Sequence, residues 1–177
     1  PITYAIVTGF NDDGVTIFNM TDPAGFLHVA SNLTDGISGG GVAATDRPNL
    51  ELDGPTGVET FYIPQDGQDL AAVPYAIITA FDDDGIQLLD LSDPEHHFAS
   101  ADKAGYHTTS PGGIVVPGTH SNATDGSDGF NLLAGAIDVA VWNTTASNHY
   151  AIVVSQLDNA FVVLDISDPT AKLFEKQ

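Results

Sequence analysis

The feature that most constrains the fold is a segment that occurs three times. Each copy begins with Tyr-Ala and two Ile or Val residues, passes through a turn rich in Asp and Asn, and ends with Asp-Pro. The copies begin at Tyr4, Tyr75 and Tyr150, and the Asp of Asp-Pro follows 18 residues later in each (4 to 22, 75 to 93, 150 to 168). An ungapped match at three places indicates an array of similar supersecondary units.

Each copy has the pattern of a β-hairpin. Two short runs rich in Val and Ile flank Asn11-Asp12-Asp13-Gly14 in the first copy and Asp82-Asp83-Asp84-Gly85 in the second. Such residues tolerate positive φ and favour the two-residue type I′ turns that join antiparallel strands. The third turn departs from this pattern, because Ala160 stands where the other copies have glycine.

A second repeated block precedes the later hairpins. The segments that start at Leu52 and Leu133 share the pattern L-x-G-x-x-[G/D]-V-x-x-[F/W]. This pattern predicts lead-in strands over 57–63 and 138–142, and apolar residues after each Asp-Pro predict outer strands over 26–30, 97–99 and 172–174. A lead-in strand, a hairpin and an outer strand together make a four-stranded antiparallel sheet, which is the blade of a β-propeller.

The sequence therefore predicts an all-β repeat domain over 1–177 with three blades of β-propeller type. Blade 1 covers about 1–50 and lacks its lead-in strand, blade 2 covers about 51–130, and blade 3 covers about 131–177. A closed propeller needs roughly four to eight blades, so the ring is incomplete within this chain. The ring could be completed in three ways: by further blades of a longer chain, by several copies in one ring, or by a head-to-tail polymer through the open edges.

The three hairpins resemble a known repeat. Their shared pattern, Y-A-[IV]-[VI] followed by D-[DN]-[GA]-[VIF]-x-[IVL]-[LF]-[DN]-[ILM]-[ST]-D-P, is similar to the LVIVD repeat. The resemblance covers most of the chain outside the two long loops. It implies a bacterial or archaeal surface or secreted protein with a β-propeller fold and a structural or binding role, and it brings no catalytic residues with it.

The charge balance excludes several classes of partner. The chain has 24 Asp and Glu residues against 4 Lys and Arg, which gives a formal net charge of −20. So negative a surface repels nucleic acid and anionic membranes, and it suits a medium rich in salt or divalent cations. No cysteine is present, so disulfides and zinc-thiolate sites are impossible. No apolar run is long enough to cross a membrane as a helix.

Acidic turns are the first candidate binding sites. Clustered carboxylate oxygens suit Ca²⁺, and turns of successive blades would lie along one rim. The alternative is an ordinary solvated turn, because the chain has no complete EF-hand or nonapeptide calcium pattern. The candidate calcium ligands are Asp12, Asp13, Asp83, Asp84, Asp125 and Asp128.

Glycosylation sequons are the second candidate sites. The motif Ser-Asn-x-Thr-Asp-Gly occurs in both long loops and places sequons at Asn32 and Asn122, and a third sequon lies at Asn143 near an expected hairpin tip. An N-x-Thr sequon accepts a glycan only in an exported protein. The sequence thus predicts Asn32, Asn122 and Asn143 as glycan sites if the chain is exported.

Catalytic motifs are missing. The sequence has no G-x-S-x-G, no H-E-x-x-H, and no lysine after the glycines at 39–41 that would make a phosphate loop. Its six histidines have no metal-binding spacing and are expected on the surface. We therefore expect an extracellular structural or adhesive protein, not an enzyme, which self-associates or binds other surface proteins through open sheet edges. The alternatives are a calcium-dependent module that binds carbohydrate or protein and, less favoured, a metal-dependent propeller hydrolase.

Overall fold

Three antiparallel sheets make up the part of the chain that the structure describes. This computed structural model describes residues 3–22, 28–34, 52–64, 72–91, 122–124, 130–145, 148–168 and 174–175. Within these ranges the chain contains strands and one 3₁₀ turn but no α-helix. The prediction of an all-β chain of antiparallel sheets is confirmed, although none of the three sheets closes on itself.

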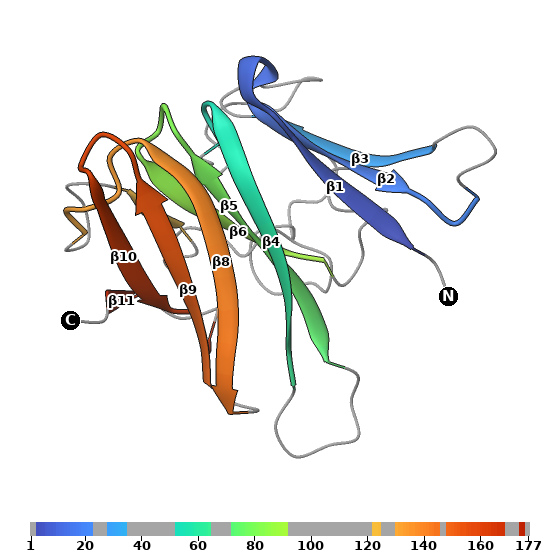
Figure 1. Ribbon diagram of the computed structural model, residues 1–177. Coiled ribbons are helices and arrows are strands. Elements are labelled where there is room, and N and C mark those ends of the chain that lie inside the picture. The colour runs from blue at the N-terminus through green and yellow to red at the C-terminus, as the bar shows by residue number, and fades with distance from the viewer. Residues whose placement is uncertain are drawn as a thin grey trace, which may run out of the picture.

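The sheets follow one another along the chain (Figure 1). The N-terminal sheet has the order β1-β2-β3 and consists of β1 (Tyr4–Gly9), β2 (Gly14–Asn19) and β3 (His28–Thr34). The central sheet has the order β4-β5-β6-β7, formed by β4 (Pro55–Ile63), β5 (Val73–Ala80), β6 (Gly85–Asp90) and β7 (Asn122–Thr124). The C-terminal sheet has the order β8-β9-β10-β11, formed by β8 (Ala136–Thr145), β9 (Asn148–Ser155), β10 (Ala160–Asp165) and β11 (Phe174–Glu175).

The three repeated segments form hairpins in one common register. The repeated tyrosines pair across each hairpin with the residue three positions before the Asp of Asp-Pro, as Tyr4 with Asn19, Tyr75 with Asp90 and Tyr150 with Asp165. Dense Val and Ile content favours these strands, because β-branched side chains pack well on a pleated surface. The hairpin prediction is confirmed in all three copies.

The hairpin turns differ from the type I′ expectation. Four residues separate the last strand pair, and only the fourth has positive φ: Asp13 at 49°, Asp84 at 53° and Asn159 at 52°. Backbone bonds from Asp84 N–H to the Phe81 carbonyl and from Asn159 N–H to the Gln156 carbonyl mark a longer turn of the type I kind. Since Gly14 and Gly85 do not have positive φ, alanine fits their position in the third copy at Ala160.

The outer strands also differ from prediction. In the central sheet the strand beside β6 is β7 (Asn122–Thr124), whereas the sequence placed it at 97–99, which lies outside the described residues. In the N-terminal sheet β3 runs from His28 to Thr34, further than the predicted 26–30. Both strands contain the Ser-Asn-x-Thr motif or part of it, so the motif that recurs in the long loops forms the outer strand of the N-terminal and central sheets.

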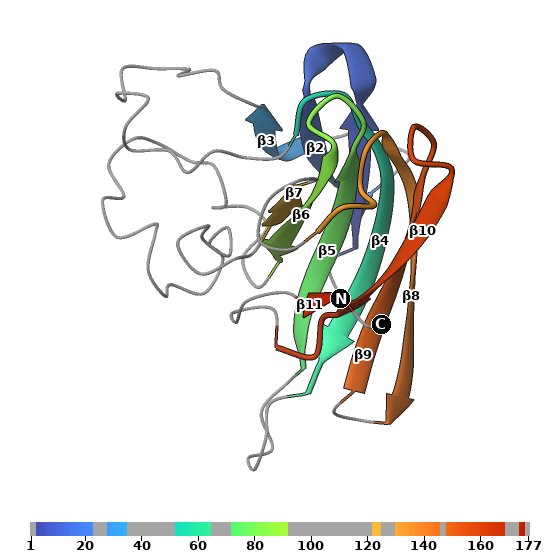
Figure 2. The same cartoon turned by 90° about the vertical axis from the view of Figure 1, so that its left-hand side faces the viewer.

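The sheets stack face to face in chain order, with the central sheet between the other two (Figure 2). One apolar cluster joins the N-terminal and central sheets through residues that include Val15, Ile78 and Leu89. A larger cluster joins the central and C-terminal sheets through residues that include Ile77, Leu88 and Val153. Residues 75–80 of β5 are all buried; Tyr75 and Ile77 enter the larger cluster, and Ala76 and Ile78 on the opposite side enter the smaller one.

Candidate functional site: the turns between neighbouring sheets

The fourth residue of each turn reaches the following sheet. Asp13 Oδ1 accepts a hydrogen bond from Gly54 N–H at 3.2 Å, and Asp84 Oδ1 accepts one from Gly135 N–H at 2.7 Å. The two bonds occupy equivalent places in the repeat, and each joins a hairpin turn to the start of the next inner strand, β4 or β8. Bonds to a charged acceptor are stronger than neutral ones, so these contacts fasten sheet to sheet.

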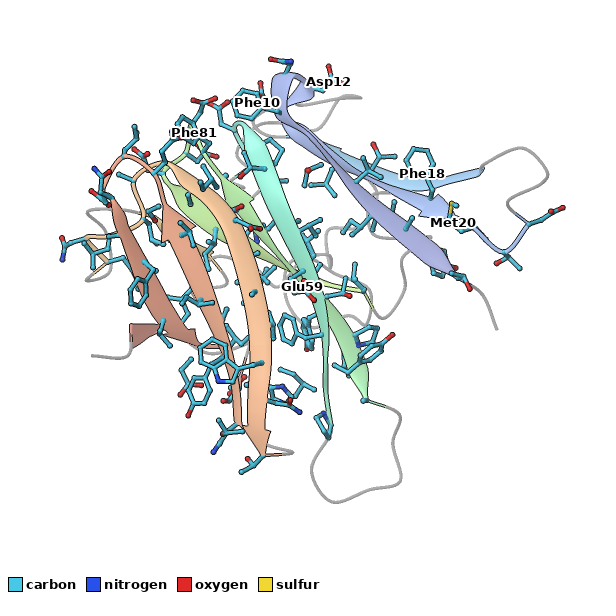
Figure 3. All side chains as sticks on the ribbon, in the orientation of Figure 1. Phe10, Asp12, Phe18, Met20, Glu59 and Phe81 are labelled. Carbon is cyan, nitrogen blue, oxygen red and sulfur yellow. The ribbon has the colours of Figure 1, made fainter. Side chains whose placement is uncertain are left out.

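The glycines at these junctions have no room for a side chain. Gly54 has φ 60° and Gly135 has φ 64°, in the left-handed region that favours glycine. A Cβ on Gly54 would lie 3.1 Å from Phe10 Cε2, and one on Gly135 would lie 3.1 Å from Phe81 Cε2. Phe10 and Phe81 are themselves 6.3 Å apart between ring centroids and sit side by side at the turns (Figure 3). The repeated L-x-G block is thus built to receive the preceding turn.

The third residue of the turn accepts a hydrogen bond from its own sheet. Asp83 Oδ2 accepts a hydrogen bond from Asp53 N–H at 2.7 Å, and Asp158 Oδ2 accepts one from Ala134 N–H at 2.9 Å. Both bonds hold the backbone just before the inner strand against the hairpin. The equivalent residue of the N-terminal sheet is Asp12, which is exposed at the tip of its turn in a sheet that has no inner strand within the described residues (Figure 3).

Carboxylates crowd at the junction of the first two sheets. Burial raises the pKa of Asp53, and the neighbouring Asp13, Asp83 and Asp82 raise it further. Burial also raises the pKa of Asp83, against the backbone N–H groups of Asp53 and Leu52, which hydrogen-bond its charged form. This junction therefore concentrates negative charge where it costs stability.

Most of the predicted calcium ligands that the structure describes accept backbone hydrogen bonds. Asp13, Asp83 and Asp84 accept backbone hydrogen bonds, whereas Asp12 is exposed. Asp125 and Asp128 lie outside the described residues. Within the described ranges no three His, Cys, Asp or Glu side chains are grouped to hold a metal ion. Calcium binding stays a prediction.

The predicted glycan sites lie on strands. Asn143 is exposed near the end of β8, opposite His149 on β9. Asn32 of β3 pairs with Thr16, and Asn122 of β7 pairs with Gln87, which holds the position equivalent to Thr16. Strand pairing accounts for the recurrence of this motif, and glycosylation at the three positions stays a prediction.

One histidine contradicts the surface expectation. His149 is 4% exposed and lies 6.4 Å from Phe61 between ring centroids, in the contact between the central and C-terminal sheets. The signal was the strand period of two, because His149 lies on the same face of β9 as Ala151 and Val153, which are buried in that contact.

Comparisons with known proteins return no match, whether against protein-family models, curated proteins or solved structures. The similarity to the LVIVD repeat accordingly rests on the hairpin residues alone. Among the described residues no helix has the length and apolar character needed to cross a membrane.

Sequence reasoning missed the fastening role of the turns. It assigned Asp13 and Asp84 to possible calcium binding and treated Gly54 and Gly135 only as parts of a repeat. The usable signal was that both features recur together: each Asp-Asp-Gly turn is followed by one L-x-G block, whereas the third turn has Asn159 in place of aspartate.

Proposed function

We propose that this chain is an extracellular or cell-surface structural or adhesive protein of the LVIVD-repeat type, whose sheets are the blades of an incomplete β-propeller. The observation that carries the proposal is that the repeated Asp, Gly and Phe residues are engaged in joining one sheet to the next. Recurrent residues that join neighbouring sheets are typical of a modular scaffold. Catalysis is no part of this proposal.

The propeller assignment has its own support. Two of the sheets have four strands and follow one another in sequence order, and their first strands, β4 and β8, are in contact with each other. Radial blades have this arrangement, because the inner strands of neighbouring blades line a common axis. The N-terminal sheet, with three strands, fits as a blade whose inner strand is not among the described residues.

Surface location is tested on cells that make the protein naturally. Intact cells are treated with an external protease and then analysed by peptide mass spectrometry, with a cytoplasmic enzyme as control. We expect the peptides of this chain to disappear before cell lysis and the peptides with Asn32, Asn122 or Asn143 to have added glycan mass. Full protection of the chain in intact cells would overturn the extracellular assignment.

A calcium-dependent binding module is the second candidate: the charges of Asp13, Asp82 and Asp83 act on Asp53, although these side chains are not grouped as ligands of one ion. A divalent cation beside them would relieve their repulsion. We expect Ca²⁺ at millimolar concentration to raise the melting midpoint more than NaCl of equal ionic strength, and Asp82→Asn to reduce the difference. Identical curves for the two salts would remove this candidate. Carbohydrate arrays with and without Ca²⁺ would then be uninformative.

A further inference from the structure

The C-terminal sheet exposes positions that the central sheet buries. Five apolar side chains on the side of the central sheet that faces the C-terminal sheet belong to the buried cluster between them, namely Phe61, Tyr75, Ile77, Ile86 and Leu88. The equivalent positions of the C-terminal sheet define what we call its forward face: Trp142, Tyr150, Ile152, Phe161 and Val163. Phe161 is 62% exposed where Ile86 is fully buried, and Trp142 is 38% exposed where Phe61 is 6% exposed.

The N-terminal sheet exposes the complementary positions. The C-terminal sheet covers the central sheet with Ala151, Val153, Val162, Leu164 and Ile166, all buried. The equivalent positions of the N-terminal sheet define its rear face: Ala5, Val7, Thr16, Phe18 and Met20. Val7 is 49% exposed where Val153 is fully buried, and Phe18 and Met20 lie on the side away from the central sheet (Figure 3). None of these five is buried.

We propose that the forward face of one copy of this chain packs on the rear face of a second copy, repeating between molecules the contact that joins sheets within one. The inference rests on the assembling role proposed above and names its partner. It deepens that role by assigning the two surfaces that meet.

Charge supports these two faces as an interface. The chain has 24 acidic residues, yet none of the ten positions of the two faces is charged; one carboxylate, that of Asp165, lies beside the forward face, across from Tyr150. Depletion of charge at the centre of a surface is the compositional signal of a protein interface. Isolated exposed apolar residues need no explanation, but apolar residues at nine of the ten equivalent positions, all but Thr16, do.

The junction residues favour a second copy over a further sheet with an inner strand. The last turn has Gln156 and Asn159 where the earlier turns have phenylalanine and aspartate to receive the glycine of the next inner strand. A following inner strand of the same kind would find neither of these receiving residues, which favours a second copy as the partner of the forward face.

Association is tested by the mass of the intact chain in sedimentation velocity. The net charge of −20 opposes contact between copies, so the medium contains about 1 M NaCl, where the Debye length is about 3 Å. We expect a mass of at least twice the chain mass of 18.5 kDa. A closed ring of two copies and a ladder of longer assemblies both contain the proposed contact.

Three variants then locate the contact. Phe161→Asp blocks the forward face and Val7→Asp blocks the rear face, and each is expected to weaken association at least about tenfold, because a charge would be buried without a partner. Tyr62→Asp is the matched control: Tyr62 is 63% exposed on β4, belongs to neither face, and its substitution adds the same charge. Circular dichroism and a cooperative melt confirm that each variant folds.

The decisive sample is an equimolar mixture of Phe161→Asp and Val7→Asp. Each variant keeps the face that the other lacks, so the mixture is expected to form one-to-one pairs and nothing larger. Monomers in wild-type chain and mixture alike, or wild-type association that survives both substitutions, would overturn the proposal. Surface exposure on intact cells is scored separately, so failure of the interface leaves the proposed location standing, and the reverse also holds.

Discussion

Gly135 N–H donates a hydrogen bond of 2.7 Å to Asp84 Oδ1, across the boundary between the central and C-terminal sheets. Asp13 and Gly54 repeat the contact one sheet earlier at 3.2 Å. The acceptor residue Asp84 has φ 53°, and the donor residue Gly135 has φ 64°. Two constrained residues, distant in sequence, therefore specify how consecutive sheets are placed.

The first prediction concerns the acceptor of this bond. Asp84→Gly keeps the turn conformation but leaves Gly135 N–H without its acceptor, and we expect it to lower the free energy of unfolding by about 1.5–3 kcal/mol. Asn159→Gly is the matched control, at the equivalent turn position with φ 52° in the last sheet that the structure describes, and should change stability by about 0.5 kcal/mol. Urea unfolding measures both, and equal losses would refute the fastening role.

The second prediction concerns the donor. Gly135→Ala is expected to cost about 2 kcal/mol or more, because an L side chain in the left-handed region is strained and its Cβ would lie 2.6 Å from Leu157 Cγ. Gly9→Ala controls for the loss of glycine flexibility. A Cβ there meets nothing nearer than 3.5 Å, and Ala80 and Ser155 occupy the equivalent positions. Thermal unfolding should rank Gly135→Ala well below Gly9→Ala.

The third prediction contrasts two buried hydroxyls. Thr79 Oγ1 accepts a hydrogen bond from Gly57 N–H at 2.8 Å, so Thr79→Val should cost about 1–3 kcal/mol by leaving that donor unpaired. Ser155 Oγ is buried and has no hydrogen-bond partner, and the equivalent residue is Ala80. Ser155→Ala should be neutral or stabilising by about 1 kcal/mol. A marked loss of stability in Ser155→Ala would contradict this reading of the site.

The fourth prediction concerns pH. Because the pKa of Asp53 is raised in the folded chain, its ionisation opposes folding once the pH exceeds its ordinary value of 3.8, and the cost is complete above the folded pKa. Asp53→Asn should therefore raise the melting midpoint near pH 7, by an amount equivalent to about 1 kcal/mol or less, and the gain should vanish towards about pH 4.

Melting curves at low ionic strength from about pH 4 to about pH 8 measure this effect. Glu59→Gln removes one negative charge from the exposed side of β4 and serves as the control for net charge (Figure 3). If Glu59→Gln produced the same gain near neutral pH, overall charge, and not the crowding around Asp53, would be responsible.

The hairpins could be read from the sequence because they are local. Tyr75 and Asp90 are close along the chain, and alternating apolar residues with turn residues between them leave few other structures. The outer strand of the central sheet could not be predicted from the sequence. Asn122 pairs with Gln87 across a long insertion, and nothing in the short segment itself specifies that partner. Non-local pairing is decided by what the rest of the sheet leaves open.

The candidate site was predicted in composition but not in role. Carboxylates at Asp13 and Asp84 were expected at the turns, and the structure has them there. Their acceptance of a backbone N–H from the next sheet depends on the stacking of whole sheets, which no local pattern encodes. The glycan sites at Asn32 and Asn122 were expected in loops for the same reason: strand pairing was invisible in the segment.

The last turn has Gln156 and Asn159 where the earlier turns have phenylalanine and aspartate, and this difference gives the stack of sheets a direction. Every fastening contact runs from an earlier sheet to a later one, so the stack has a sense along the chain, like an arrow, and its two ends are chemically unlike. Any longer structure made from such units would inherit that polarity. Growth or capping at one end would then proceed by different contacts, and at a different rate, from the same event at the other.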